Sequence, residues 1–345
     1  MKFRMAFAGF GVVAQGLTEL LIEKKSLLKQ QYGMEWDILA ISDLHKGSIL
    51  DPKGLDMPSV LAHLKKKQTL KGYPAPTTGF NVMEMIDQAP ANMLVEVTYT
   101  NVKTGQPAAN HIKKALHKKW HVATTNKGPI INYGKELIQL AKDNNIGLGF
   151  EGVVMSGTPT IGLVMRNLAG SCFSEIKGIL NGTTNYILSE MEKGLTYSIA
   201  LHQAQQLGYA EADPTSDVEG WDALGKIIIL SHLLMNSHIT LDEAHRQGIT
   251  HITLQDIKEA QKNDQRYKLL ARSTQKDGNI TVSVMPELIP QGDPLASVQG
   301  ATNALTLSTD TLGDITIIGA GAGKRETGYS LLTDILYINH HFGRQ

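Results

Sequence analysis

The sequence is almost devoid of cysteine, since Cys172 is the only one among 345 residues. An intrachain disulfide framework is therefore excluded, which fits a reducing compartment and leads us to expect a cytoplasmic protein. We interpret Cys172 as a small buried hydrophobic residue rather than a nucleophile. The N-terminus also lacks a long apolar run with a cleavage site, so we expect no secretory leader.

An excess of charge of one sign is absent too, because 33 basic residues balance 33 acidic ones. We therefore expect no nucleic-acid partner, and the short run Lys65–Lys67 reads as the solvated surface of a helix. The longest strongly apolar run, Ile227–Leu230, is far too short to cross a bilayer, so no membrane partner is expected. The chain is long enough for two domains with a sizeable core.

The first part of the chain alternates between strand-like and helical patterns. Apolar runs of strand length occur at residues 3–8, 36–42, 93–97 and 121–125. Helical patterns occur from the glycines after the first run to about residue 29, and at residues 109–117 and 135–144. This alternation predicts a parallel, doubly wound α/β sheet. Residues 71–80 contain two prolines and two glycines and predict a loop.

The pattern changes after about residue 150. Strands are expected at residues 172–180 and within residues 280–318, with a helix at residues 222–234 between them. A late glycine cluster at residues 319–323 precedes a helix at about residues 326–336. We expect a nucleotide-binding domain built from residues 1–145 and 319–345, and a second, mixed α/β domain from residues 146–318.

A glycine-rich turn at the end of the first predicted strand indicates a dinucleotide site. Gly9-Phe-Gly11-Val-Val-Ala14 fits the G-x-G-x-x-G/A pattern, in which the first glycine permits a tight turn and the second lets a diphosphate approach the backbone. The helix that follows offers the N–H groups of Val12 and Val13 to the anion. A glycine-rich turn without a ligand is the alternative.

Asp43 follows the second predicted strand, where an acid can bind the adenosine ribose of NAD. His45 and Lys46 lie beside it and can meet the 2′-phosphate of NADP, so the choice between NAD and NADP stays open. Asp43 can equally be a turn residue after a strand.

Two later segments carry groups suited to reducing a carbonyl. In residues 208–226, Asp222 and Lys226 are four apart at a helix start, so the aspartate can orient a lysine that donates a proton. Glu211 and Asp217 lie in the preceding loop, where they can bind a substrate ammonium. The alternatives are capping residues and a surface ion pair.

In residues 177–186 a predicted strand ends in Asn-Gly, after which Thr183 and Thr184 begin a helix. Hydroxyl and N–H groups at a helix start suit a carboxylate, although a threonine N-cap is the alternative. Lys127 follows the fourth predicted strand, and the carboxyl ends of such strands face the ligand crevice.

Together these segments resemble the homoserine dehydrogenase family, from the first strand to about Leu336. The most specific matches are KGILNGTTNYIL (177–188), GYAEADPTSDVEGWDALGK (208–226) and GAGAGKRETGYSLLTDI (319–335). The resemblance implies a Rossmann-type nucleotide domain and a mixed α/β domain that builds the catalytic site and a homodimer interface. It also implies NAD(P)-dependent interconversion of L-aspartate 4-semialdehyde and L-homoserine in threonine and methionine biosynthesis.

The resemblance assigns roles to particular residues. Lys226 would be the proton donor, oriented by Asp222, with Lys127 near the nicotinamide. The implied substrate residues are Glu211, Asp217, Thr183 and Tyr209. The implied coenzyme residues are Gly9, Gly11, Val12, Val13, Ala14, Asp43, Thr98, Lys127, Gly321 and Gly323. A sodium ion would be held at Glu151, Val154, Ser156 and Thr158, mainly through backbone oxygens.

The chain departs from the family pattern at three positions. Ala320 stands where proline is common and Gly328 where alanine is common, and both are expected to loosen the late glycine turn; Met155 replaces a glycine of the ion loop. The sequence shows neither an aspartate kinase part nor a C-terminal regulatory domain. A related amino-acid dehydrogenase and a nucleotide-sensing protein without turnover are the alternative functions.

Overall fold

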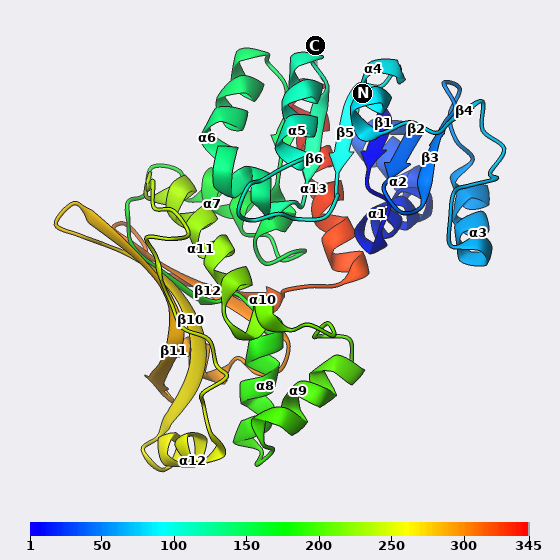
Figure 1. Ribbon diagram of the computed structural model, residues 1–345. Coiled ribbons are helices and arrows are strands. Elements are labelled where there is room, and N and C mark those ends of the chain that lie inside the picture. Colours follow the sequence, from blue (N-terminus) through cyan, green and yellow to red (C-terminus); the bar gives the residue numbers. More distant parts are fainter. Residues whose placement is uncertain (344–345) are drawn as a thin grey trace. The chain divides into compact units, whose positions relative to one another are not determined.

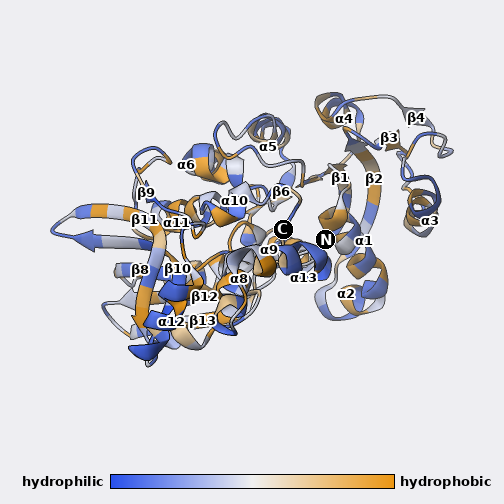
Figure 2. Cartoon of the chain, turned by 60° about the horizontal axis from the view of Figure 1, so that its bottom comes forward, coloured by the Kyte–Doolittle hydropathy of each residue, from blue (hydrophilic) through white to orange (hydrophobic). Residues whose placement is uncertain are grey.

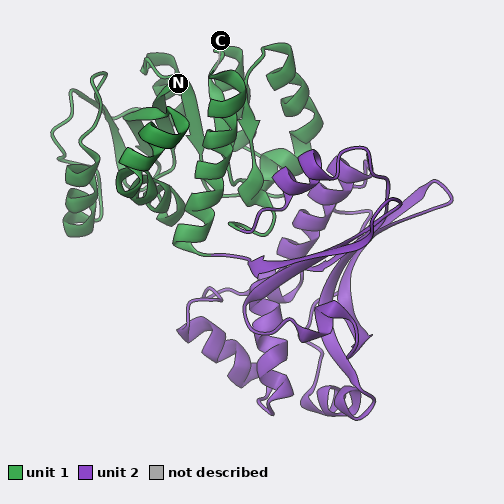
Figure 3. Ribbon diagram, turned by 180° about the vertical axis from the view of Figure 1, so that it is seen from behind, with its two compact units in different colours: residues 1–157, 323–345 green, residues 158–322 purple. Residues whose placement is uncertain are grey.

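The computed structural model describes residues 1–343 (Figure 1). The chain forms two compact units: unit 1 comprises residues 1–157 and the chain from residue 323 onwards, and unit 2 comprises residues 158–322 (Figure 3). The first boundary lies later in the chain than the expected residue 145, because Leu148–Gly149 still adds a strand to the sheet of unit 1. Among the described residues, no helix combines the length and the apolar character that a membrane span requires.

Unit 1 contains a 7-stranded sheet in the order β4-β3-β2-β1-β5-β6-β7. The strands are β1 (Lys2–Ala8), β2 (Glu35–Asp43), β3 (Gly47–Leu50), β4 (Thr77–Thr78), β5 (Met93–Glu96), β6 (His121–Thr124) and β7 (Leu148–Gly149). Strands β2, β1, β5, β6 and β7 run parallel, which confirms the expected fold class, whereas β3 and β4 add antiparallel pairs at one edge. The sequence pattern did not indicate these two short strands, and β4 lies within the expected loop.

Helices cover both faces of this sheet. They are α1 (Val12–Glu23), α2 (Lys25–Tyr32), α3 (Met57–Lys67), α4 (Val82–Gln88), α5 (Ala108–His117), α6 (Lys127–Asp143), the 3₁₀ turn η1 (Glu151–Val153) and α13 (Lys324–Phe342). Successive side chains of a strand point to opposite faces. Phe3 and Phe7 of β1 therefore pack with α1, α2, α3 and α13, while Ala6 and Ala8 pack with α4, α5 and α6. This is the layering of a doubly wound sheet.

The first helix differs from the expectation, because it does not continue to Lys29. Helix α1 ends at Glu23 and α2 begins at Lys25. Between them Lys24 has φ −96° and ψ 10°, which lies outside the α-helical region. Neither glycine nor proline stands at the break, so the sequence carries no signal for it.

Two glycines bring α1 and α13 into close contact. A Cβ atom at Gly16 would lie 2.2 Å from the backbone oxygen of Lys324, and one at Gly328 would lie 2.6 Å from the backbone nitrogen of Leu17. The expectation that Gly328 loosens a turn is therefore wrong, because this residue lies inside α13 at a helix–helix contact. Ala320 is likewise not a turn residue but the last residue of a strand.

Unit 2 contains a 6-stranded sheet in the order β13-β12-β8-β10-β11-β9. The strands are β8 (Phe173–Ile179), β9 (His245–Arg246), β10 (Gln265–Lys276), β11 (Asn279–Pro290), β12 (Thr302–Thr309) and β13 (Gly313–Ala320). Neighbours are antiparallel except β9 and β11, so the sheet is mixed, as expected. The long β10–β11 hairpin carries both hydrophobic and hydrophilic residues (Figure 2). Apolar and polar residues alternate at Ile280–Val284 of β11, whereas β10, which the sequence pattern did not indicate, has its apolar residues in the run Leu269–Ala271.

The helices of unit 2 are α7 (Ile161–Asn167), α8 (Gly182–Glu192), α9 (Tyr197–Gln206), α10 (Thr215–Val218), α11 (Trp221–Leu234), α12 (Leu254–Lys262) and the 3₁₀ turn η2 (Pro294–Ser297). Helix α11 is buried continuously from Ala223 to Ser231, because this stretch is apolar on nearly all sides, with Lys226 as its one charged residue. The expectation for Cys172 is wrong: this residue precedes β8 and is exposed, and Phe173 begins the strand with a buried side chain instead.

Candidate active site

The glycine-rich turn of unit 1 has the backbone geometry that a diphosphate site needs. Gly9 has φ +85°, and a Cβ atom there would lie 2.7 Å from the backbone oxygen of Val97. A Cβ atom at Gly11 would have no heavy atom within 4 Å, so the space beside this residue is open. Helix α1 begins at Val12, and no side chain caps its first N–H groups. These residues fit an anionic diphosphate.

The other residues of the motif serve packing and the start of the helix. Ala14 is fully buried, which fits close contact between helix and sheet, whereas Val12 is 63% exposed. Val13 is partly buried against the core of unit 1.

Asp43, at the end of β2, holds the glycine turn and the β2–β3 turn together. Its Oδ2 accepts the Phe10 N–H at 2.8 Å, and its Oδ1 accepts the N–H groups of His45 and Lys46 at 3.0 and 2.9 Å. Burial opposes ionisation, but these N–H groups and the Lys46 ammonium outweigh it and hold the pKa of Asp43 below its usual value. Asp43 is therefore a turn-organising residue, whatever else it contacts.

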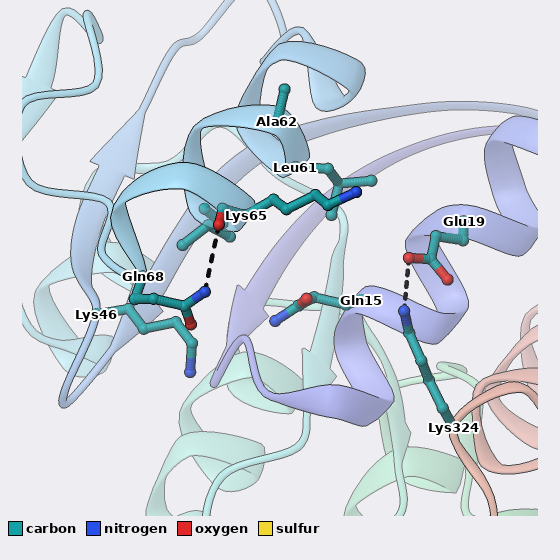
Figure 4. A pocket seen from close by; sticks show the side chains of 9 residues that line it. Gln15, Glu19, Lys46, Leu61, Ala62, Lys65, Gln68 and Lys324 are labelled. Carbon is teal, nitrogen blue, oxygen red and sulfur yellow. Dashed lines mark hydrogen bonds and ion pairs between the residues drawn. The ribbon is translucent and has the colours of Figure 1, made fainter.

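A cavity of about 490 Å³ lies beside α1 and α3 (Figure 4). Its lining residues are Gln15, Glu19, Lys46, Leu61, Ala62, Leu64, Lys65, Gln68 and Lys324. Lys324 is paired with Glu19 at 2.6 Å, and Lys46 lies 3.8 Å from Asp43. Lys65 and Gln68 come from α3 and its C-terminal end, and the Gln68 amide donates to the Lys65 backbone oxygen at 3.4 Å. The cavity thus offers several cationic and amide groups near the end of β2.

The carboxyl ends of β5 and β6 carry a buried polar cluster centred on Glu96, which is 0% exposed. Glu96 accepts hydrogen bonds from the Thr98 hydroxyl and, at 3.1 Å, from the Asn126 amide. The Asn126 Oδ1 atom is buried and has no hydrogen-bond partner among the residues that the structure describes. Lys127 follows directly as the first residue of α6. Thr98 and Lys127 therefore both lie at the sheet edge where α/β proteins bind ligands.

In unit 2, Lys226 and Asp222 form the expected contact. The Lys226 ammonium lies 2.7 Å from Asp222 Oδ2 and donates to the backbone oxygen of Leu180, also at 2.7 Å. The side chains are only 10% and 15% exposed, respectively. This is a shielded ion pair rather than a surface pair, and its orientation is fixed by the end of β8.

Asn181 joins Asp222 to Asp217. Its amide nitrogen donates to Asp217 Oδ1 at 2.7 Å and to Asp222 Oδ2 at 3.0 Å. Burial and the Asp222 charge raise the pKa of Asp217, against the opposing effects of Asn181, Lys226 and the Thr183 hydroxyl. Asp217 was expected in a loop, but it lies in the short helix α10, which brings it next to α11.

Thr183 does not cap α8, because Asn181 is the N-cap and accepts the Thr184 N–H at 2.9 Å. The Thr183 hydroxyl instead donates to the backbone oxygen of Tyr209 at 2.7 Å. The Tyr209 ring lies 5.1 Å from that of Tyr186, centroid to centroid. Glu211 is exposed two residues further on in the same loop, and its backbone oxygen accepts from Gln205. The loop that carries Glu211 is thus tied to α8 through Thr183.

The residues of the predicted ion loop divide between the two units. In unit 1, Glu151 lies in η1 and is buried, Val154 follows it, and the Ser156 hydroxyl contacts that of Thr327. Met155 has φ +52° and is fully buried, so it adopts the backbone conformation that the glycine of the family pattern favours. Among residues 1–343 there is no group of three or more His, Cys, Asp or Glu side chains that could hold a metal ion.

The last three predicted residues lie in tight backbone surroundings. Thr158, in unit 2, donates through its hydroxyl to the Ala320 oxygen at 3.0 Å. A Cβ atom at Gly321 would lie 2.2 Å from the Asn303 side chain, so a larger residue there would displace the Asn303 amide. Gly323 has φ +142° and immediately precedes α13.

Sequence reasoning did not select Asn181, Asn303 or Asn126. The amide of Asn303 is buried, and neither of its polar atoms has a hydrogen-bond partner within the described part of the chain. Asn181 lies in the segment 177–188, and its position directly before a predicted helix could have indicated an N-cap. The carboxylates that accept from the Asn126 and Asn181 amides come from distant segments, so these roles could not be read from spacing.

The fold and the glycine turn define the class: a dinucleotide-binding oxidoreductase with a Rossmann-type sheet. Two family models agree, since "Homoserine dehydrogenase, NAD binding domain" matches residues 9–151 and "Homoserine dehydrogenase" matches residues 159–336. The chain belongs to the homoserine dehydrogenase family. It is accordingly an NAD(P)-binding enzyme that acts on a small molecule, as the sequence predicted.

Individual relatives support this over almost the whole chain. The NAD(+)-dependent homoserine dehydrogenase of Pseudomonas canavaninivorans is 40% identical and covers 100% of this chain and 98% of its own. The homoserine dehydrogenase of Methanocaldococcus jannaschii is 38% identical over 96% of both chains. Among solved structures, a putative homoserine dehydrogenase from Archaeoglobus fulgidus has a TM-score of 0.88 at 34% identity, covering 97% and 99% of the two chains. A hyperthermophilic archaeal homoserine dehydrogenase mutant in complex with NADPH has a TM-score of 0.84 at 31% identity, covering 98% of each chain.

Proposed function

We propose that the chain interconverts L-aspartate 4-semialdehyde and L-homoserine in threonine and methionine biosynthesis, with Lys226 as the group that gives and takes the proton. The shielded contact of Lys226 with Asp222 and the Leu180 oxygen carries this assignment. Two of the three ammonium N–H groups are engaged there, and the third is directed to the substrate oxygen. Asp222 keeps the lysine oriented and compensates its charge.

The proton and the hydride leave the substrate separately. In the oxidation of homoserine, the hydroxyl proton passes to the neutral amine of Lys226 while the C–H electron pair leaves as hydride. A bound nicotinamide would supply the hydride acceptor for this oxidation and the hydride donor for the reduction. In reduction, the Lys226 ammonium protonates the developing alkoxide. Lys127, at the carboxyl end of β6, assists in proton handling near the nicotinamide.

The amino-acid end of the substrate meets α8, α10 and the loop before α10. We assign Glu211 and Asp217 to the substrate ammonium, and Thr183 with Tyr209 to the carboxylate end. Support comes from the Thr183–Tyr209 hydrogen bond of 2.7 Å, which holds the Glu211 loop against α8. Glu211 is exposed, so its carboxylate is accessible to an incoming substrate.

We propose that NADP is accepted as well as NAD. Gly9, Gly11, Val12, Val13 and Ala14 form the diphosphate turn, and Thr98, Lys127, Gly321 and Gly323 complete the coenzyme set. The cavity with Lys46 and Lys65 near the end of β2 suits a 2′-phosphate (Figure 4). Asp43 does not oppose this, because its negative charge is already compensated by three backbone N–H groups and Lys46.

Three further properties belong to the proposal. A sodium ion is held by backbone oxygens near Glu151, Val154, Ser156 and Thr158, a donor type that suits a hard monovalent cation.

The enzyme is a homodimer, supported by β13 at the end of its sheet, where Ile318 is 52% exposed. We place it in the cytoplasm. Sedimentation analysis tests the dimer, and activity after exchange of sodium for a larger cation tests the ion.

The decisive experiment follows the absorbance of reduced nicotinamide with purified protein, L-homoserine and either NAD or NADP. Formation of reduced coenzyme is the expected result, and the ratio of the two rates gives the coenzyme preference. If the protein binds coenzyme but turns over neither homoserine nor any related amino alcohol, the proposal fails in favour of a nucleotide sensor. Turnover of a related substrate alone would indicate another amino-acid dehydrogenase.

A further inference from the structure

Asn181 lies where β8 has ended and α8 begins, and its side-chain amide has only one possible orientation. The Oδ1 atom accepts the Thr184 N–H at 2.9 Å and the Thr184 hydroxyl at 3.0 Å. A backbone N–H group can only donate, so this end of the amide must be the oxygen. The NH₂ group therefore points the other way. Asn181 is 4% exposed, which shields these contacts from water.

The NH₂ group uses both of its protons on carboxylates from other elements. One proton goes to Asp217 of α10 at 2.7 Å and the other to Asp222 of α11 at 3.0 Å. The same Asp222 oxygen accepts from Lys226 at 2.7 Å. Because the Leu180 oxygen also accepts from Lys226, two consecutive residues at the end of β8 hold the whole cluster.

Like charges lie close together in this cluster. Burial and the Asp222 carboxylate raise the pKa of Asp217, while the Asn181 amide and the Lys226 ammonium lower it. Like charges so close together favour protonation of one of them, which would alter the field around the lysine. A neutral amide that donates to both carboxylates stabilises their ionised forms without adding charge.

We propose that Asn181 is a positioning residue for the reaction: its amide keeps Asp217 and Asp222 in place, and thereby fixes the orientation and protonation of Lys226. This inference rests on the proposed role of Lys226. Asn181 acts through Lys226 and makes no contact with the reacting atoms.

The test compares Asn181→Asp with Asn181→Ser. Both new side chains can still cap α8, since Asp and Ser are favoured N-cap residues, so the helix start is kept. Asn181→Asp replaces the NH₂ donor by a third carboxylate of nearly the same shape. Asn181→Ser removes the donor without adding charge, because its hydroxyl is too short to reach both carboxylates. Asn81→Asp is the matched control, since Asn81 caps α4 in unit 1.

We expect Asn181→Asp to lower kcat for homoserine about 10–100-fold, as a misplaced catalytic group does. The added negative charge favours the ammonium form of Lys226. Homoserine oxidation needs the neutral amine, so the rising limb of its pH profile should move to higher pH. Asn181→Ser should lower kcat without that upward displacement, and Asn81→Asp should match the wild type.

A second readout does not depend on turnover. The pH at which an amine-directed reagent modifies Lys226, measured by mass spectrometry without substrate, should rise in Asn181→Asp. Wild-type kcat and pH profile in that variant would overturn the inference, as would parallel losses of stability and activity in both variants with an unchanged profile. If the wild type does not oxidise homoserine, the proposed function fails, whereas the modification profile still decides whether Asn181 controls Lys226.

Discussion

Replacing Lys226 by methionine separates the catalytic role of the lysine from its structural role. Methionine has a similar length and no charge, so the change removes the Lys226 ammonium from beside the shielded Asp222 carboxylate; the Asp222 side chain is only 15% exposed. Removing one partner of a buried ion pair costs about 3–5 kcal/mol. We expect about 3 kcal/mol, the low end of this range, because Asn181 continues to donate to Asp222 at 3.0 Å. The kcat should fall about 10²–10⁴-fold, the range for general acid–base catalysis.

The double variant Lys226→Met/Asp222→Leu makes the test decisive. With the Asp222 carboxylate removed as well, the free energy of unfolding should return to within about 1 kcal/mol of the wild type, because apolar pairs replace buried ion pairs at little cost. Activity should not return, since the proton donor is still missing. Stability would be measured by urea unfolding followed by circular dichroism, and kcat by the absorbance of reduced nicotinamide.

A control variant distinguishes this pair from ion pairs in general. Lys177 and Asp293 form a similarly shielded pair at 2.8 Å in the same unit, with side chains 18% and 13% exposed. Lys177→Met should lower stability and leave kcat near the wild-type value. If Lys226→Met retains wild-type kcat, the assignment of the proton donor is refuted. If it is also as stable as the wild type, the reasoning about the shielded pair is refuted as well.

Three further outcomes are expected. Glu211→Leu should mainly raise KM for homoserine at nearly constant kcat and leave KM for the coenzyme unchanged, and an unaltered KM for homoserine would contradict its role at the ammonium. The double variant Lys46→Met/Lys65→Met should raise KM for NADP but not for NAD, and parallel changes would contradict the 2′-phosphate assignment. Burial lowers the pKa of His121 from 6.5 to about 4, so the unfolded chain binds a proton more readily than the folded one between these values. The free energy of unfolding should be at its full value above pH 6.5 and fall by about 3 kcal/mol towards pH 4. Between these two pH values, His121→Asn should lose about 3 kcal/mol less stability than the wild type, as measured by urea unfolding.

The sequence predicted what depends on periodicity and local motifs. The parallel strands of unit 1, the glycine turn and the contact between Asp222 and Lys226 each follow from neighbouring residues, because strand alternation, a tight turn and a helical spacing of four are local properties. The division of the first helix at Lys24 could not be predicted, since no helix-breaking residue marks it. Burial was misjudged at Cys172 because a single residue beside a strand end carries no pattern.

The parts of the candidate site that the sequence did not reveal depend on contacts between distant segments. Asn181 receives its role only because α10 and α11 bring Asp217 and Asp222 to the end of β8. Gly328 resembles a turn residue by its place after a glycine cluster, yet it is required by the approach of α1 from the opposite end of the chain. Neither of these contacts can be predicted from the spacing of residues along the chain.

Asp43 illustrates why the coenzyme preference cannot be read from residue type. An acid after the second strand commonly selects NAD by binding the ribose and repelling a 2′-phosphate. Repulsion requires an uncompensated charge, but this carboxylate accepts three backbone N–H groups and lies 3.8 Å from the Lys46 ammonium. Its charge is therefore largely neutralised by groups that also shape the glycine turn. We therefore expect the lysines of the adjoining cavity to select the coenzyme, so that removing one positive charge there should change the affinity for NADP alone.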